Sequence, residues 1–357
     1  MQDYFVQLDK ENSKIVKGFV KLKGNEISNN EVEIRIPDLG VNKKFKTDKK
    51  GVVEFNFETT NVNYWSPENP TLYNVELKTS EDQVNDLIGF RSIKTEGTSI
   101  LLNDKKIFLK GISIHEENPI RGGRAYSKED AELLLGWAKE LGCNFVRLAH
   151  YPHNENMIRI ADKLGILVWE EIPVYWTIDW ENKETYQNAL NQLSEVISRD
   201  KNRAATIIWS VSNETPNSDA RFTFLSNLAQ TARQLDQTRL ISSALEVSNF
   251  DNDPNLKTIH DPFAAVVDVL SFNAYVGWYD GLPDKCKKVN WKIDIDKPVI
   301  ISEFGGGAKY GFHADSLTRW SEEYQEYLYK ENIKMFERLP QLSGMTPWIL
   351  TDFRSPR

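Results

Sequence analysis

The sequence predicts an immunoglobulin-like β-sandwich followed by an α/β (β/α)8 TIM barrel, and three observations support this fold class. Apolar and polar residues alternate with period two from residue 1 to about residue 95. After Gly97, short apolar runs alternate with segments of helical periodicity. The length of 357 residues favours two domains over one.

Short alternating runs in the first region predict half-buried antiparallel strands. Turn residues such as Pro37-Asp38 and Lys50-Gly51 bound these runs. Strands of this spacing are typical of a β-sandwich of immunoglobulin size, so the first domain is predicted to span residues 1–95. The alternating apolar residues are Val32, Ile34 and Ile36; Val53, Phe55 and Phe57; and Tyr73, Val75 and Leu77.

The second region, residues 96–357, contains eight strand candidates separated by helical segments. Ser127 and Asp130 suit the first turn of a helix over Lys128–Leu141, and a second helix is predicted over Ala220–Leu235. Eight strands alternating with helices match a (β/α)8 barrel in count and length. A doubly wound open sheet is the alternative, but no Gly-rich phosphate loop follows the first strand, which favours the barrel. The strand candidates are Ile107–Ile114, Phe145–Ala149, Leu167–Glu171, Thr206–Ser212, Leu240–Ala244, Val269–Tyr275, Val299–Phe304 and Gly344–Leu350.

The eighth strand candidate ends close to Arg357, which leaves no room for an eighth helix. We therefore expect a barrel that is truncated after strand eight, in a chain that is a fragment of a longer parent. On this interpretation Met1 is not the native start, so the lack of a signal peptide does not indicate the compartment.

Composition excludes several classes of function. The chain carries 44 Lys and Arg against 52 Asp and Glu, a net charge of −8, and no basic block, which argues against nucleic-acid binding. No apolar stretch approaches the ~20 residues that a membrane span needs. Neither Cys143 nor Cys286 belongs to a Cys/His cluster, so no zinc site is predicted. We expect neither a metal nor another cofactor.

The active site of a (β/α)8 barrel lies at the carboxyl ends of its strands. Glu214 and Glu303 end the fourth and seventh strands and would face each other across one pocket. Glycoside hydrolysis needs two carboxyl groups, about 5–5.5 Å apart for retention or ~6.5–9.5 Å apart for inversion. A glutamate at a strand end is more often structural, and Glu170 and Glu171 are equally well explained as partners of Arg147. Spacing alone predicts a barrel enzyme and leaves its chemistry open.

Several motifs make the chain resemble family 2 glycoside hydrolases over essentially its whole length. In the first region these are Trp65-Ser66-Pro67-Glu68 and Gly89-Phe90-Arg91. In the barrel they are Gly111 to Glu116, Val146-Arg147 through His150-Tyr151-Pro152, Ile208-Trp209-Ser210 through Asn213-Glu214, Asn273 to Tyr279, Ile301-Ser302-Glu303-Phe304-Gly305, and Trp320 to Gln325. The ordered set is most similar to the β-glucuronidase and short β-galactosidase branch.

This resemblance implies a retaining exo-β-glycosidase that hydrolyses terminal β-linked sugars. Glu214 would be the general acid/base and Glu303 the nucleophile. Asn213 would hydrogen-bond the sugar 2-hydroxyl, and Tyr275 would hold the nucleophile. Arg147 or Tyr275 would keep Glu303 ionised, and the charge of Glu303 would keep Glu214 protonated for the leaving group. The remaining residues expected to line the −1 subsite are His115, Arg147, His150, Tyr279 and Trp348.

The chain departs from the family pattern in ways that leave alternatives open. The large β-galactosidases carry Glu and His magnesium ligands after strand three, whereas the segment from Glu171 to Trp176 contains no His. The Asn and Lys that grip the sugar carboxylate in β-glucuronidases would lie beyond Arg357, so galactoside or glucuronide specificity stays open. A catalytically silent carbohydrate-binding remnant and a structural subunit of a larger hydrolase are the alternatives to an enzyme. Whether the intact parent is a homo-oligomer is also open.

Overall fold

Seven strands near the amino terminus form two facing sheets. The computed structural model describes residues 1–25 and 27–354. One sheet has the order β1-β2-β5 and the other the order β4-β3-β6-β7. The apolar residues predicted to alternate along β3, β5 and β6 are buried together between the sheets, which confirms the β-sandwich. The strands are β1 (Asp3–Leu8), β2 (Ile15–Lys21), β3 (Glu31–Ile36), β4 (Val41–Lys46), β5 (Val52–Glu58), β6 (Tyr73–Lys78) and β7 (Gln83–Ile88).

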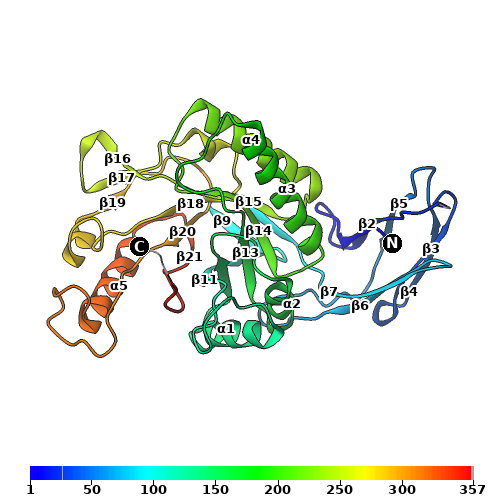
Figure 1. Ribbon diagram of the computed structural model, residues 1–357, viewed down its shortest axis with the longest axis horizontal. Coiled ribbons are helices and arrows are strands. Elements are labelled where there is room, and N and C mark those ends of the chain that lie inside the picture. Colours follow the sequence, from blue (N-terminus) through cyan, green and yellow to red (C-terminus); the bar gives the residue numbers. More distant parts are fainter. Residues whose placement is uncertain (26, 355–357) are drawn as a thin grey trace.

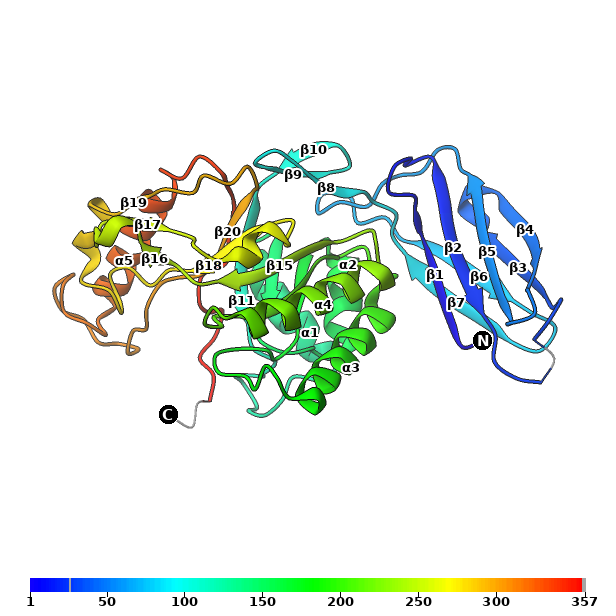
Figure 2. The same cartoon turned by 90° about the horizontal axis from the view of Figure 1, so that it is seen from above.

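Eight parallel strands form a closed barrel beside the sandwich (Figures 1 and 2). They are β11 (Leu109–Ile114), β12 (Phe145–Leu148), β13 (Leu167–Glu171), β14 (Thr206–Asn213), β15 (Leu240–Leu245), β18 (Leu270–Asn273), β20 (Val299–Glu303) and β21 (Leu342–Met345). The eighth strand begins two residues earlier than Gly344 and ends before Trp348. It pairs with β20 on one side and β11 on the other. The predicted barrel is therefore confirmed.

Five α-helices accompany the barrel strands in the described part of the chain. Ser127 caps the first helix and forms a capping box with Asp130, as the sequence predicts. Between β15 and β20 the described chain replaces helices by 3₁₀ turns and a small sheet, β16 (Ser248–Asn249), β17 (Leu256–Thr258) and β19 (Asn290–Trp291), so the predicted strand–helix alternation fails there. No helix follows β21 up to residue 354. The helices are α1 (Lys128–Glu140), α2 (Glu155–Leu164), α3 (Lys183–Asp200), α4 (Asp219–Leu235) and α5 (Glu322–Phe336).

A three-stranded sheet connects the sandwich to the barrel. It consists of β8 (Ile93–Glu96), β9 (Ser99–Leu102) and β10 (Lys105–Ile107). Ile93, Ile100 and Leu102 of this sheet belong to the same apolar cluster as residues of the barrel strands and of helices α1 and α2. Division of the chain into domains at residues 95 and 96 stays a prediction, and β8 spans that position.

The motif Gly89-Phe90-Arg91 lies at the junction of sandwich and barrel. Phe90 is buried in the sandwich core, whereas the buried Arg91 donates to the carbonyl oxygens of Ala204 (3.1 Å), Thr238 (3.0 Å) and Thr206 (2.6 Å) in the barrel. A Cβ atom on Gly89 would lie 2.8 Å from the Ala204 Cβ, so the close approach of the two regions requires glycine. The motif therefore joins the two regions.

Within the described residues, no helix is long and apolar enough to cross a membrane.

Candidate active site

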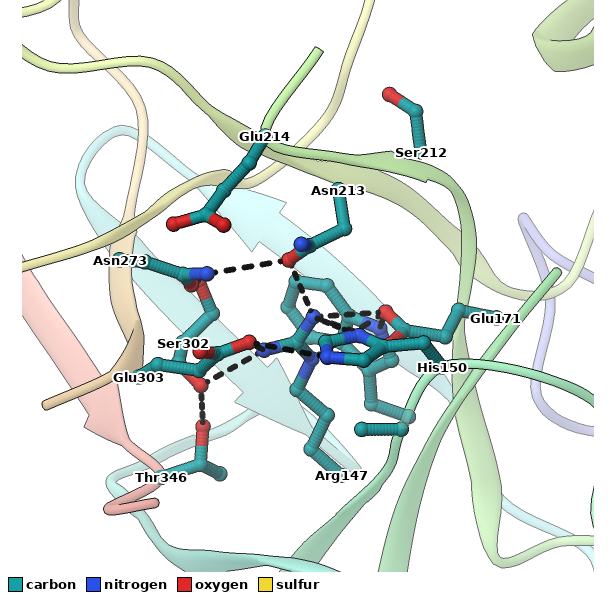
Figure 3. A network of polar contacts seen from close by, with 12 residues as sticks. Arg147, His150, Glu171, Ser212, Asn213, Glu214, Asn273, Ser302, Glu303 and Thr346 are labelled. Atoms are coloured by element: carbon teal, nitrogen blue, oxygen red, sulfur yellow. Dashed lines mark hydrogen bonds and ion pairs between the residues drawn. The ribbon is translucent and has the colours of Figure 1, made fainter. Parts of the chain in front are cut away.

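Polar side chains from five strands meet at the carboxyl end of the barrel (Figure 3). Arg147 comes from β12, Glu171 ends β13, Asn213 ends β14, Asn273 ends β18 and Glu303 ends β20. Parallel strands all present this end to the same face of the barrel, which brings residues that are far apart in sequence together. Of the predicted site residues, the structure joins Arg147, Asn213, Tyr275 and Glu303 in one hydrogen-bond network, to which His150 is linked through Glu171.

The fully buried guanidinium of Arg147 is the centre of this network. Its Nη1 donates to Oε1 of Glu303 at 2.7 Å, and its Nη2 donates to Oδ1 of Asn213 at 2.8 Å. Its Nε and Nη2 both reach the carboxylate of Glu171 at 3.1–3.2 Å. A planar guanidinium can hold three partners at once because its five N–H donors point in fixed directions. Arg147 thereby sets the relative positions of strands two, three, four and seven at the site.

Both oxygens of the Glu303 carboxylate have donors. Arg147 occupies Oε1, and the hydroxyl of Tyr275 donates to Oε2 at 2.6 Å. His150 Nε2 lies 3.5 Å from Oε1. Burial raises the pKa of Glu303; Arg147, His150 and the Tyr275 hydrogen bond lower it, and the nearby charge of Glu214 raises it again. The net direction is upward, so burial outweighs the two groups that the sequence analysis expected to keep Glu303 ionised.

Glu171 has the opposite pKa shift. Burial raises the pKa of this carboxyl, but the charge of Arg147 and the hydrogen bond from His150 Nδ1 (2.7 Å) outweigh burial and bring the pKa to about 2. The indole nitrogen of Trp169 also donates to Glu171, at 2.9 Å. Glu171 is therefore a permanent anion that neutralises Arg147.

Glu170 does not contribute to the site, so of the two glutamates considered as partners of Arg147 only Glu171 contacts it. Because successive side chains of a strand point to opposite faces, Glu170 lies on the outer face of β13. There it accepts a hydrogen bond from the Thr206 hydroxyl at 2.7 Å and faces Arg199 and Asp200 at the end of α3.

Glu214 lies directly after β14 and is partly exposed, unlike Glu303. Its backbone is in the left-handed region (φ +48°), and its N–H donates to the carbonyl of Ala244 at 2.9 Å. The carboxylate accepts a hydrogen bond from Nε1 of Trp176 at 3.1 Å. It also lines a cavity of about 420 Å³ together with Trp176, Leu245, Val247 and Asn273. The two candidate catalytic carboxyls thus differ: one is buried and clamped, and the other lies at the mouth of the site.

A pair of amides adjoins the carboxylates. The Oδ1 atom of Asn213 accepts from Arg147 and, at 3.2 Å, from Nδ2 of Asn273. The Ser302 hydroxyl orients Asn273 in turn by donating to its Oδ1 at 2.7 Å. Because its oxygen is engaged, Asn213 has its amide nitrogen to offer to a ligand.

Aromatic rings form one wall of the site. The ring of Trp348 stacks on His150, with centroids 5.1 Å apart, and meets the edge of His115 at the same distance. Burial and the neighbouring His150 lower the pKa of His115 to about 4, so its imidazole is neutral near pH 7. Tyr279 is 81% exposed at the rim, where its ring packs on Tyr275. Tyr279 and Trp348 both line a second cavity, of about 830 Å³.

Sequence reasoning missed three contributors to the site. Trp176 and Trp169 each donate a hydrogen bond to a carboxylate, and Ser302 orients Asn273. Ser302 stands beside the nucleophile candidate and could have been found from its position, whereas nothing in the pattern around Trp176 indicates its contact. Among the described residues, no group of three or more His, Cys, Asp or Glu side chains is placed to hold a metal ion.

Two carboxyls and an arginine at the carboxyl ends of the barrel strands, after a β-sandwich, fit the class of glycoside hydrolases. The family model described as "Glycosyl hydrolases family 2, TIM barrel domain" matches residues 93–355, and the model "Glycosyl hydrolases family 2" matches residues 1–91. The chain belongs to glycosyl hydrolase family 2.

Several curated relatives of the chain are β-glucuronidases. The chain is 31% identical to the β-glucuronidase of Paenibacillus borealis, in an alignment that covers 99% of this chain and 61% of that protein. It is 30% identical to the β-glucuronidase of Mus musculus, over 83% of this chain and 48% of that protein. The chain therefore spans about half to three fifths of the length of these curated relatives.

Solved structures of the family share the fold. A β-galacturonidase from Eisenbergiella tayi, bound to galacturonate, matches with a TM-score of 0.80 and 28% identity over 97% of this chain and 63% of that chain. A β-D-glucuronidase from Dictyoglomus thermophilum matches with a TM-score of 0.79 and 28% identity over 100% and 63% of the two chains.

Proposed function

We propose that the protein is a retaining exo-β-glycosidase that releases terminal β-linked uronic acids, of the β-glucuronidase type. One observation carries the mechanism: Arg147 and Tyr275 clamp the buried carboxylate of Glu303, whereas Glu214 lies at the cavity mouth. A nucleophile must be held in line with the anomeric carbon, and an acid must reach the departing oxygen. The names of the relatives support the uronic acid as substrate.

The proposed reaction consists of two successive displacements at the anomeric carbon. Glu303 attacks the anomeric carbon while the glycosidic bond breaks, and Glu214 gives its proton to the departing oxygen. Asn213 donates its amide to the sugar 2-hydroxyl, an interaction that strengthens in the transition state of such reactions. Ester formation removes the negative charge of Glu303, so Glu214 can then act as the base that takes a proton from the incoming water.

Retention of configuration makes a geometric prediction. The carboxyl groups of Glu214 and Glu303 should lie about 5–5.5 Å apart. A crystal structure of the protein with a bound monosaccharide would measure this separation. A value above ~8 Å would exclude direct displacement by Glu303.

The decisive experiment compares two variants on two kinds of substrate. Glu303→Gln should abolish hydrolysis of every glycoside and prevent trapping of a covalent adduct by a 2-fluoro glycoside, seen by mass spectrometry. Glu214→Ala should nearly retain kcat/KM on dinitrophenyl β-glucuronide, whose leaving group needs no proton, and lose about 10²–10⁴-fold in kcat/KM on phenyl β-glucuronide. The control is Glu54→Gln, an exposed glutamate on the sandwich.

Other outcomes would select the alternatives. Binding of glucuronate without turnover of any nitrophenyl β-glycoside would favour a carbohydrate-binding remnant. Equal losses in Glu214→Ala on the two aryl glycosides would reject Glu214 as the acid. Faster turnover of β-galactosides than of β-glucuronides would reject the uronic acid as the preferred substrate.

A further inference from the structure

The indole of Trp176 contacts the candidate acid/base directly. Its Nε1–H donates to Oε2 of Glu214 at 3.1 Å. An indole N–H is a donor only, so this contact has a fixed direction. Trp176 belongs to the loop after β13, and none of the motifs that identify the family includes it.

The backbone of both residues adopts a conformation that is rare for their side chains. Among the described residues other than glycine, nine have positive φ, and six of these are Asn or Asp, which tolerate it. Trp176 (φ +57°) and Glu214 (φ +48°) are two of the other three. Such conformations cost free energy and concentrate at functional sites. The strain at Trp176 therefore points to a use for its side chain at this position.

The loop that carries Trp176 is tied to the residue beside Glu214. The N–H of Asn213 donates to the carbonyl of Val174 at 2.9 Å, and the N–H of Trp176 donates to the carbonyl of Asn213 at 3.2 Å. Tyr175 forms an isolated parallel bridge with Asn213. The backbone segments that carry the indole and the Glu214 carboxylate are thus hydrogen-bonded to each other, which holds the two side chains near one another.

The position of the contact matters because of the cavity around it. Trp176, Glu214, Leu245, Val247 and Asn273 line the cavity of about 420 Å³. If Glu214 protonates the departing oxygen, as the proposed function requires, the leaving group sits in this cavity. The indole N–H then reaches one carboxyl oxygen and leaves the other to face the leaving group.

We propose that Trp176 is a positioning residue that determines which oxygen of Glu214 carries the catalytic proton. Its N–H makes Oε2 the carbonyl-like acceptor, so the acidic hydrogen is on Oε1. When the glycosidic bond breaks, its electron pair passes to the departing oxygen, which takes the proton from Oε1. The negative charge that forms on Glu214 is then shared with the N–H donor. This inference rests on the proposed function.

The first test measures how the loss of the N–H depends on the leaving group. Trp176→Phe keeps an aromatic ring without a donor. We expect kcat/KM for phenyl β-glucuronide to fall on the order of tenfold, and kcat/KM for dinitrophenyl β-glucuronide to stay within about twofold. Trp176→His, which keeps a ring N–H, should retain more activity on the phenyl glycoside than Trp176→Phe. The control is Trp180→Phe, in the same loop, whose ring packs on Phe224 away from the cavity.

The second test places Trp176→Phe in a Glu214→Ala background. A residue that acts through Glu214 has no further effect once Glu214 is removed, so the double variant should match Glu214→Ala on every substrate. An additive loss in the double variant would overturn the proposal for Trp176. So would an equal loss on all leaving groups in Trp176→Phe. Neither outcome would affect the proposed function. Absence of any turnover by the unaltered protein would instead refute the proposed function.

Discussion

Glu170 and Glu171 are adjacent in sequence but differ in role, because their side chains point to opposite faces of β13. Glu171 points into the barrel, where Arg147 and His150 bring its pKa to about 2. Glu170 points outward, where burial and the neighbouring Asp200 carboxylate raise its pKa well above the usual range. One carboxyl is thus a fixed anion of the active site, and the other tends to hold a proton under α3.

Arg147→Lys tests the guanidinium as the organiser of the site. An ammonium keeps the charge but cannot bind Glu303, Glu171 and Asn213 together. Because misplacement by about 1 Å costs on the order of 10² in rate, we expect kcat for an aryl β-glucuronide to fall by at least that factor. Arg199→Lys is the control, since Arg199 pairs with Asp200 outside the barrel at 2.7 Å. A loss below tenfold in Arg147→Lys would show that charge alone suffices.

At the scale of elements, the contact between β13 and α3 buries two neighbouring carboxyl groups, those of Glu170 and Asp200. Arg199 balances part of the charge of Glu170 and Asp200, but burial raises the pKa of both carboxyls. A group whose pKa is higher in the folded state stabilises the fold fully below its unfolded pKa, about 4.3 for Glu. This contribution is lost as pH rises through the folded pKa.

Glu170→Gln should therefore remove one loss of stability that accompanies rising pH. Above about pH 5, the unfolding free energy measured in urea should change less favourably with rising pH in the unaltered protein than in the variant. His115 and His153, whose pKa values burial lowers to about 4 and about 3, contribute an opposite slope in both proteins. Asp162, whose pKa burial raises to about 6, adds its own loss in both proteins, so the difference between them is the relevant quantity. Glu195→Gln, exposed on α3, should keep the unaltered slope. If the unfolding free energy changed with pH at the same slope in all three proteins, the raised pKa of Glu170 would be refuted.

The elements were predictable from sequence wherever a local pattern determines them. The alternating residues of β3 and β5 predicted these strands, and Ser127 predicted the start of α1. Glu303 and Asn213 were proposed as site residues because the ends of the strands converge in a barrel. The face occupied by Glu170 was not predictable, because both faces of β13 are buried and its five residues carry no alternating pattern to show which glutamate points inward.

Loops were less predictable than strands, for a physical reason. The contact of Trp176 with Glu214 depends on a left-handed backbone that hydrophobic periodicity does not encode. Likewise, the segment between β15 and β20 forms 3₁₀ turns and two-residue strands, whose short length leaves no periodic pattern to detect.

At the scale of the whole molecule, Arg91 ties the sandwich to the barrel, and no carboxylate of the described residues lies within hydrogen-bonding distance of it. Its three acceptors are backbone carbonyls of the barrel, at 2.6–3.1 Å. Arg203 adds contacts to the Leu87 carbonyl (2.8 Å) and to Asp86 of β7. A junction made of buried directional bonds holds the two regions at one relative orientation.

Arg91→Met should lower the unfolding free energy by about 2 kcal/mol or more. Two of the three buried carbonyls lose a donor, at about 1–3 kcal/mol each, whereas the Thr206 carbonyl keeps a hydrogen bond from Nε of Arg239 at 3.2 Å. Chemical denaturation followed by tryptophan fluorescence would measure the change. Arg35→Met removes a pair with Glu76 on the exposed face of the sandwich and should cost at most about 1 kcal/mol. Similar effects of the two substitutions would mean that the junction contributes little to stability.

Closure of the barrel by β11 and β21 has a consequence for the order of events in folding. These strands come from opposite ends of the barrel sequence and pair Leu109 with Gly344. Such a long-range pairing must overcome the entropy of a large loop, so it forms late, after local helices and neighbouring strands. Arg147 can reach Glu303 only when β20 has joined the sheet. We therefore expect the active site to assemble only as the barrel closes, after the local helices have formed.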